Sequence, residues 1–183
     1  MHEYTNMPYI YGIGFPRTGT LSVATGLKEM GFDSVHATNF GDLLKHEAVI
    51  GEPAAFWWKE LAAAFPKARF VLTIRNIDAW RDSCARMFRE HFWMNRIANE
   101  ADMTLQLIYK RWFGSAEYDP SWIPVYVQHN ADVQTFFSSA PERLCVIDLA
   151  DGNAFEMLGA FLGKEHPKKG FPHLNKNKFE SMP

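Results

Sequence analysis

The clearest chemistry in this sequence belongs to a short loop that has a glycine at each end and an arginine inside. Gly14 and Gly19 bound the loop, and Arg17 lies within it. An apolar run typical of a β-strand leads into the loop, and a helical pattern from about Leu21 to Met30 follows it. Backbone N–H groups converge at such a junction and the helix dipole adds positive potential. The loop therefore predicts a site for phosphate or a phosphate-like group.

The loop keeps the glycine spacing of the P-loop of nucleotide triphosphatases, GxxxxGK[ST], but replaces two of its functional residues. Thr20 stands where that motif has lysine, and Leu21 stands where it has the magnesium-binding hydroxyl. The cation lies inside the loop instead, at Arg17, which favours a metal-free group transfer over ATP- or GTP-dependent chemistry. A dinucleotide-binding GxGxxG fingerprint is excluded, because Arg17 occupies its third glycine position.

The loop Phe15-Pro16-Arg17-Thr18-Gly19-Thr20 resembles the 5′-phosphosulfate loop of the sulfotransferases that use 3′-phosphoadenosine 5′-phosphosulfate (PAPS), which usually contains Pro-Lys-Ser-Gly-Thr. A second motif of that family is a strand that ends in arginine, with a serine eight residues later. Arg75 and Ser83 keep this spacing. The tail Phe171-Pro172-His173-Leu174-Asn175 is similar to the C-terminus of a family branch whose loop has the form Pro-Arg-Thr-Gly-Thr. The resemblance runs from about Tyr9 to Asn175 and implies a PAPS-dependent sulfotransferase.

The resemblance implies that two arginines bind opposite ends of PAPS. Arg17 would contact the bridging oxygen of the phosphosulfate and stabilise charge on the leaving phosphate. Arginine holds its proton more firmly than the lysine usual there, so acid donation is not expected. Arg75 and Ser83 would bind the 3′-phosphate, with a structural ion pair to Asp78 or Asp82 as the alternative for Arg75.

Further contacts to PAPS are expected from the rest of the loop and from the tail. Leu21 departs from the second threonine common in the family, and Ser22 is the nearby hydroxyl that would compensate. The element Lys168-Lys169-Gly170 resembles the family's Arg-Lys-Gly element that closes over the 3′-phosphate, and a solvated basic turn is the alternative. The loop residues expected at the cofactor, besides Arg17, are Pro16, Thr18, Gly19, Thr20, Leu21 and Ser22.

The acceptor nucleophile needs a general base, for which the resemblance suggests a histidine or glutamate near the third strand or the first helical region. Glu52 is the first choice, and its alternative is a carboxylate that only stabilises a helix N-terminus. His36, at the end of the second predicted strand, is the second choice and His46 the third. His129 lies on an apolar helical stripe and is predicted to be structural, while His173 in the tail fits either role.

Strands alternate with helices along the chain, which predicts a P-loop type α/β fold with three layers around a parallel sheet of about five strands. Ligands bind at the carboxyl ends of such strands, so Arg17, Glu52 and Arg75 are expected at one edge of the sheet. One domain is expected over residues 1–183, with loose tails at 1–8 and about 176–183. The expected strands are 9–13, 34–36, 48–51, 70–74 and 144–147, and the expected helices are 21–30, 40–46, 53–65, 78–90, a stripe over 97–112, 122–137 and 155–162.

Composition indicates a globular chain without nucleic-acid or membrane partners. The 183 residues are 47% hydrophobic and 22% charged, with a formal net charge of −2 and no apolar run of membrane-spanning length. No leader pattern begins the chain, and Cys84 and Cys145 are expected to be buried free thiols, which together predict a cytoplasmic location. No set of side chains has metal-ligand spacing, so no metal is expected. The sequence leaves the oligomeric state open.

An aromatic content of 15% gives the one indication of the acceptor. Adjacent pairs such as Trp57-Trp58 and Phe92-Trp93 cannot both face one core, so some rings should line a cleft for a small apolar or aromatic alcohol. The rings considered are Phe56, Trp57, Trp58, Phe92, Trp93, Trp112 and Trp122.

The main hypothesis is metal-independent, in-line transfer of a sulfuryl group from PAPS to a hydroxyl, phenol or amine, which leaves adenosine 3′,5′-bisphosphate. The alternatives are a P-loop kinase, and a non-catalytic relative that binds nucleotide or protein. The second of these is kept because the chain is short for a sulfotransferase.

Overall fold

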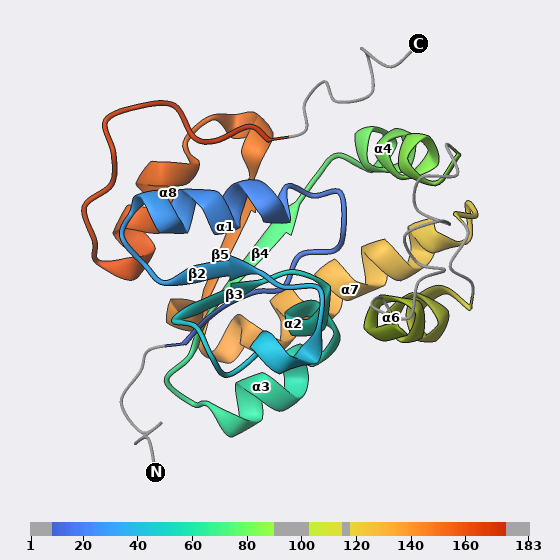
Figure 1. Ribbon diagram of the computed structural model, residues 1–183, viewed down its shortest axis with the longest axis horizontal. Helices are drawn as coiled ribbons and strands as arrows, with labels where there is room; N and C mark the ends of the chain where they lie inside the picture. The colour runs from blue at the N-terminus through green and yellow to red at the C-terminus, as the bar shows by residue number, and fades with distance from the viewer. Residues whose placement is uncertain (1–8, 90–102, 115–117, 175–183) are drawn as a thin grey trace.

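The structure is a computed structural model that describes residues 9–89, 103–114 and 118–174 (Figure 1). Within these ranges, five parallel strands form one sheet in the order β2-β3-β1-β4-β5. The strands are β1 (Ile10–Gly12), β2 (Ser34–His36), β3 (Ala48–Ile50), β4 (Arg69–Ile74) and β5 (Leu144–Asp148). The predicted α/β fold with a parallel sheet of about five strands is confirmed.

Helices lie on both faces of the sheet and make three layers. One face is covered by α1 (Thr20–Glu29) and α8 (Ala154–Leu162), which Figure 1 shows on the same side. The other face is covered by α2 (Glu52–Phe56), α3 (Trp58–Ala64) and α7 (Trp122–Phe136). A third apolar cluster joins α7 to α4 (Ile77–Arg89) and α6 (Met103–Phe113). Short 3-10 helices are η1 (Phe40–Asp42), η3 (Phe137–Ser139), η4 (Pro141–Arg143) and η5 (Leu149–Asp151).

Strand β4 is covered by helices on both faces of the sheet, and most of its residues are apolar. Phe70 and Leu72 point into the core under α7, whereas Val71 points into the core under α1. Alternate residues of a strand face opposite sides of a sheet, so a strand covered on both sides is mainly apolar on both faces. Because all five strands are parallel, the segments that follow β1, β3 and β4 meet at one edge.

Two of the predicted helices differ in the structure. The helix expected over 53–65 is two helices, because Trp57 leaves the helical conformation at φ −101° and ψ 19°. This break lets Trp58 enter the core while Trp57 stays 39% exposed. The helix expected over 40–46 is reduced to η1, where the Asn39 amide bonds to the Asp42 carboxylate at 2.9 Å and stabilises a turn.

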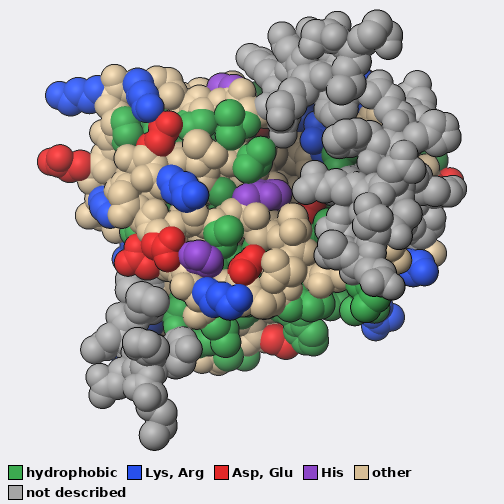
Figure 2. All heavy atoms as spheres, viewed as in Figure 1, with side chains coloured by type: hydrophobic (Ala, Val, Ile, Leu, Met, Phe, Trp, Pro, Cys, Tyr) green, Lys and Arg blue, Asp and Glu red, His purple; other side chains and the backbone are tan. Residues whose placement is uncertain are grey.

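Several other expectations can be compared with the described residues. Cys84 and Cys145 are free and buried, as predicted. None of the helices in the described ranges is long and apolar enough to cross a membrane. On the face seen in Figure 2, side chains of both charge signs are interspersed. Phe92, Trp93 and the start of the stripe over 97–112 lie outside the described residues.

His129 is a structural residue, as predicted. Its side chain is 8% exposed and stacks on Phe15, with the ring centroids 4.2 Å apart. Nε2 lies 2.8 Å from the Ile13 carbonyl oxygen, which can only accept, so Nε2 carries the hydrogen. Burial lowers the pKa of His129 from 6.5 to about 4. The ring therefore ties α7 to the segment that enters the loop, and does so in its neutral form.

Acid is expected to destabilise the fold through His129, by about 1–3 kcal/mol between about pH 7 and about pH 4.5. In the unfolded chain a histidine takes up a proton near pH 6.5, whereas His129 in the folded chain takes up a proton only near pH 4. The unfolded chain thus binds more protons across this window, so falling pH favours unfolding. Urea unfolding of the wild type and of His129→Gln, which keeps a donor for Ile13 but cannot titrate, measures the difference. Identical pH dependence in the two proteins would contradict the assignment.

Candidate active site

The loop after β1 leaves a row of backbone N–H groups open at the start of α1. Gly19 precedes the helix with φ 101°, and no side chain of the described residues caps the helix start. Within the described residues, no backbone carbonyl accepts from the N–H groups of Gly19, Thr20, Leu21 or Ser22. The first N–H that is bonded is that of Val23, to the Gly19 carbonyl at 3.1 Å. Unpaired N–H groups at a helix N-terminus form a site for an anion.

Thr18 closes the loop and uses its own polar groups to do so. Its hydroxyl donates to the Phe15 carbonyl at 2.6 Å and lies 2.5 Å from the Thr73 hydroxyl on β4, while its N–H bonds to the same carbonyl at 3.3 Å. Gly14 permits this close approach, because a Cβ there would lie 1.9 Å from Thr73 Oγ1. Thr18 therefore shapes the loop, and its hydroxyl is engaged by the protein.

Arg17 is half-buried within the loop and is held from both its side chain and its backbone. Its Nε donates to Ser83 Oγ at 3.0 Å, and its φ of 69° is positive, which no other non-glycine residue of the described ranges shows. Burial lowers the pKa of Arg17, and the nearby charges of Arg75 and Arg86 lower it further. In the described part of the chain no carboxylate pairs with Arg17 or Arg75. The positive charge of the pair is therefore available to a ligand.

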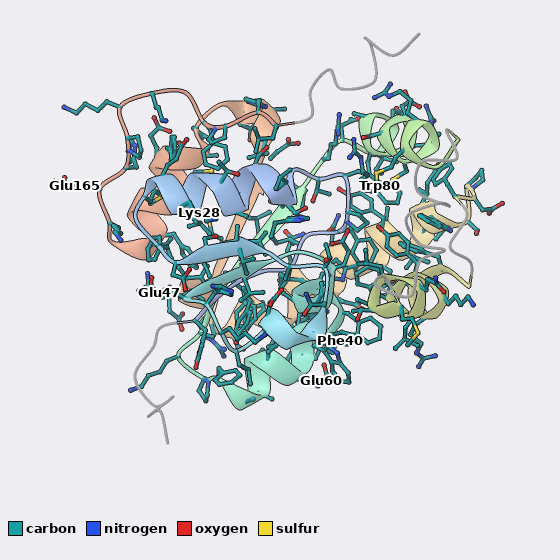
Figure 3. The ribbon with its side chains drawn as sticks, in the orientation of Figure 1. Lys28, Phe40, Glu47, Glu60, Trp80 and Glu165 are labelled. Carbon is teal, nitrogen blue, oxygen red and sulfur yellow. The ribbon has the colours of Figure 1, made fainter. Side chains whose placement is uncertain are left out.

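Arg75 lies beside Arg17, although the two are 58 residues apart in the sequence. Its Nη1 donates to the Arg17 carbonyl at 3.1 Å. The Tyr126 hydroxyl fixes its backbone by accepting from the Arg75 N–H and donating to the Arg75 carbonyl, both at 2.8 Å. Trp80, labelled in Figure 3, stacks on Tyr126 and donates to the Pro16 carbonyl at 2.9 Å. These contacts join the end of β4 to the loop after β1.

Ser83 lies next to the two arginines and contacts Arg17. It is 2% exposed on α4, and its hydroxyl accepts from Arg17. The motif assigned it to the same phosphate as Arg75, and the structure brings all three residues into one cluster in which Arg17 is the centre.

Glu52 is a buried carboxylate with one oxygen unpaired. It is the first residue of α2 and is only 6% exposed. Its Oε1 accepts from the Tyr109 hydroxyl at 3.5 Å, while Oε2 has no hydrogen-bond partner in the described structure. Tyr109 also lies close enough to Arg17 to raise the pKa of that guanidinium. An unsatisfied buried oxygen is costly, and Tyr109 links this carboxylate to the surroundings of Arg17.

A family model described as a sulfotransferase domain matches residues 37–179. The chain belongs to the sulfotransferase family. The match begins after β2, so it excludes the loop between β1 and α1, but it includes Glu52, Arg75 and Ser83. A similar protein is the Ava biosynthesis cluster protein M of Aspergillus versicolor, 24% identical over 217 residues that cover 88% of this chain and 78% of that protein. The family resemblance of the sequence is confirmed.

The tail of this sulfotransferase runs along α1 toward the loop. Lys169 pairs with Glu29 at the last residue of α1, at 3.0 Å, and the Leu174 N–H donates to Ser22 Oγ in the first turn, at 3.0 Å. Ten residues of helix are about 15 Å long. The structure thus places Lys168-Lys169-Gly170 at the end of α1 away from the anion loop and does not bring this element to Arg75. It brings Leu174 to the loop helix instead.

The histidines considered from the sequence lie in three different settings. His36, at the end of β2, is close to the loop, where its Nε2 lies 3.0 Å from Thr20 Oγ1. His46 pairs with Asp33 at 3.0 Å near the start of β2, at the opposite edge of the sheet. His173 is exposed on the tail.

A set of partly exposed rings, here called the aromatic wall, lies next to Glu52 in this sulfotransferase. Its members are Phe40, Phe56, Trp57 and Trp112. Phe56 is one helical turn after Glu52, and its ring centroid is 5.5–6.1 Å from the other three. Phe40 is labelled in Figure 3 near α2. Trp58 and Trp122 are buried core residues instead.

Tyr109 and Tyr126 contact candidate site residues, and the sequence did not reveal either contact. Both lie on helices whose apolar faces enter the third cluster. The spacing of apolar residues on a helix identifies a buried ring, but it does not show that the hydroxyl of that ring reaches a neighbouring strand end or carboxylate.

Proposed function

We propose that this sulfotransferase transfers a sulfuryl group from PAPS to a hydroxyl, phenol or amine of a small acceptor and leaves adenosine 3′,5′-bisphosphate. The observation that carries the proposal is the position of Arg17 beside Arg75 at the open N-terminus of α1, where no carboxylate of the described residues pairs with either arginine. Two adjacent guanidinium groups beside the N–H groups of a helix N-terminus fit a ligand with several negative charges.

Each group of the cluster has a task in this proposal. PAPS supplies an activated sulfuryl group. The N–H groups from Gly19 to Ser22 and the Arg17 guanidinium hold its phosphosulfate end, and Arg17 stabilises the charge that develops on the leaving phosphate. Arg75 binds the 3′-phosphate. Glu52 takes the proton of the acceptor through Oε2, which has no partner in the described structure.

The acceptor is proposed to be a small apolar or aromatic alcohol. The aromatic wall supports this, because Phe56 follows Glu52 on the same short helix and Trp57 is 39% exposed. A flat ring bound against these side chains would hold its hydroxyl toward the start of α2. We further propose a cytoplasmic location, since two buried free thiols fit a reducing compartment.

Calorimetry on the full chain tests the cofactor. Binding of adenosine 3′,5′-bisphosphate without metal is expected. A requirement for ATP with Mg²⁺ would instead indicate a kinase, and binding of neither nucleotide would indicate a non-catalytic relative. Radiolabelled PAPS offered with aryl alcohols and with sugars then tests the acceptor, with transfer to the aryl alcohols expected.

Arg75→Ala is expected to weaken binding of adenosine 3′,5′-bisphosphate by about 1.5–3 kcal/mol, the range for a hydrogen bond to a charged group. The substitution removes one guanidinium of the pair while Tyr126 still bonds to the backbone of residue 75. Arg81→Ala is the matched control, because Arg81 is exposed on α4 and pairs with Asp78 and Asp82. Equal affinity of the Arg75 variant and the wild type, measured by calorimetry, would show that Arg75 is not a phosphate ligand.

A further inference from the structure

We infer that His36 is a positioning residue that turns the Thr20 hydroxyl into a donor for the bound phosphosulfate. The inference rests on the proposed function, since it needs an anion at the loop. Its basis is the contact of 3.0 Å between His36 Nε2 and Thr20 Oγ1. This contact joins the carboxyl end of β2 to the first residue of α1.

Thr20 is placed where a hydroxyl can contact an anion. It is the first residue of α1, it is 6% exposed, and its own N–H lies in the open row at the helix start. The hydroxyl of Thr18 already donates to a backbone carbonyl, and that of Thr25 donates to the Leu21 carbonyl at 3.0 Å. In contrast, the one partner of the Thr20 hydroxyl among the described residues is the His36 ring, which can either donate or accept a hydrogen.

The hydrogen on the imidazole decides what Thr20 can do, because a hydroxyl has one hydrogen to donate. If Nε2 carries the ring hydrogen, His36 donates to Thr20 Oγ1 and the hydroxyl hydrogen is left for the anion. If Nδ1 carries it, Nε2 accepts a hydrogen bond from the Thr20 hydroxyl, and Thr20 has no hydrogen left to donate to the anion. An anion at the loop favours the first arrangement, which a protonated ring also provides. The result is a donor chain from His36 through Thr20 to the ligand.

The same contact makes His36 a poor candidate for the general base. Nε2 faces Thr20 at the phosphate end of the site, whereas Glu52 and the aromatic wall follow β3. In the described structure Nδ1 has no hydrogen-bond partner that would orient the ring for proton transfer. His36 is therefore assigned to the cofactor and Glu52 to the acceptor.

A double-mutant cycle on the affinity for adenosine 3′,5′-bisphosphate tests the donor chain. Thr20→Val, which keeps the shape, is expected to weaken binding about tenfold, and Thr20→Ser to stay near the wild type. His36→Leu is expected to weaken binding about fivefold when residue 20 is threonine, and less than about twofold when it is introduced into the Thr20→Val variant. His36→Gln, whose amide can donate from nearly the same place, should restore most of the loss.

The outcomes separate this inference from the proposed function. If the wild type binds the nucleotide and the affinity losses of His36→Leu and Thr20→Val add in the double variant, His36 does not act through Thr20. The inference is then overturned while the proposed function stands. If the wild type does not bind adenosine 3′,5′-bisphosphate, both the inference and the proposed function are overturned. Nitrogen NMR of the histidine rings in the wild-type complex gives a reading that does not depend on any variant folding. Hydrogen on Nε2 of His36 supports the inference, and a neutral ring with hydrogen only on Nδ1 overturns it.

Discussion

Glu52→Gln is expected to lower the rate constant of sulfuryl transfer by about 10²–10⁴-fold, the usual contribution of a general base. The amide keeps the shape of the carboxylate and can still accept from the Tyr109 hydroxyl, but it cannot take up the acceptor proton. Affinity for adenosine 3′,5′-bisphosphate should change little, because Glu52 belongs to the acceptor side of the site. Stability should change little, because the lost interaction with the start of α2 is offset by the lower desolvation cost of an amide at Oε2, which has no partner in the described structure.

Glu60→Gln is the matched control for this result. Glu60 also lies in the first turn of a helix, α3, but it is exposed. Both substitutions remove the same favourable interaction with a helix dipole, so only the Glu52 variant should lose transfer. Single-turnover measurements with an accepted substrate provide the comparison. Near-normal transfer by the Glu52 variant would show that another group takes the proton.

Arg17→Ala is expected to lower turnover by about 10²–10³-fold, as does the loss of one donor that stabilises transition-state charge. The nucleotide should still bind through the N–H groups of α1 and through Arg75, so its affinity should fall much less. Arg17→Lys is the matched control. Lysine keeps a positive charge. Alanine, lysine and arginine all carry a Cβ, so the backbone strain at φ 69° is the same in the three proteins and does not explain a difference between them. Lysine should therefore recover much of the turnover.

Turnover and nucleotide affinity must be measured on the same preparations, because the role of Arg17 is inferred by comparing the loss in one with the loss in the other. An equal loss in both quantities for Arg17→Ala would identify Arg17 as a ligand of the ground state only. The expected excess loss in turnover would identify it as a residue that acts mainly on the transition state.

The parts of the site that the sequence predicted are those that local pattern determines. Gly14, Arg17 and Gly19 lie within six residues, and a parallel sheet brings the ends of β1, β3 and β4 to one edge whatever their distance in the chain. The family resemblance also pointed to Arg75, which lies beside Arg17. Glu52 stood out because it follows an apolar strand directly.

The remaining parts depend on packing between distant segments. The bond from Arg17 to Ser83 requires α4 to lie over the loop, and the contact between Glu52 and Tyr109 requires α6 to lie against α2. A Lys-Lys-Gly pattern likewise does not reveal the ion pair that joins Lys169 to Glu29 at the far end of α1. Spacing along one element carries no information of this kind.

The burial of both thiols makes this chain well suited to labelling with a single fluorescent dye. Cys84 and Cys145 are 0% and 7% exposed, and the sequence has no other cysteine, so maleimide reagents will react slowly with the folded native protein. His173 is exposed and precedes the residue that bonds to Ser22 in the first turn of α1. A dye attached through His173→Cys would report optically on occupancy of the loop without a radiolabelled substrate.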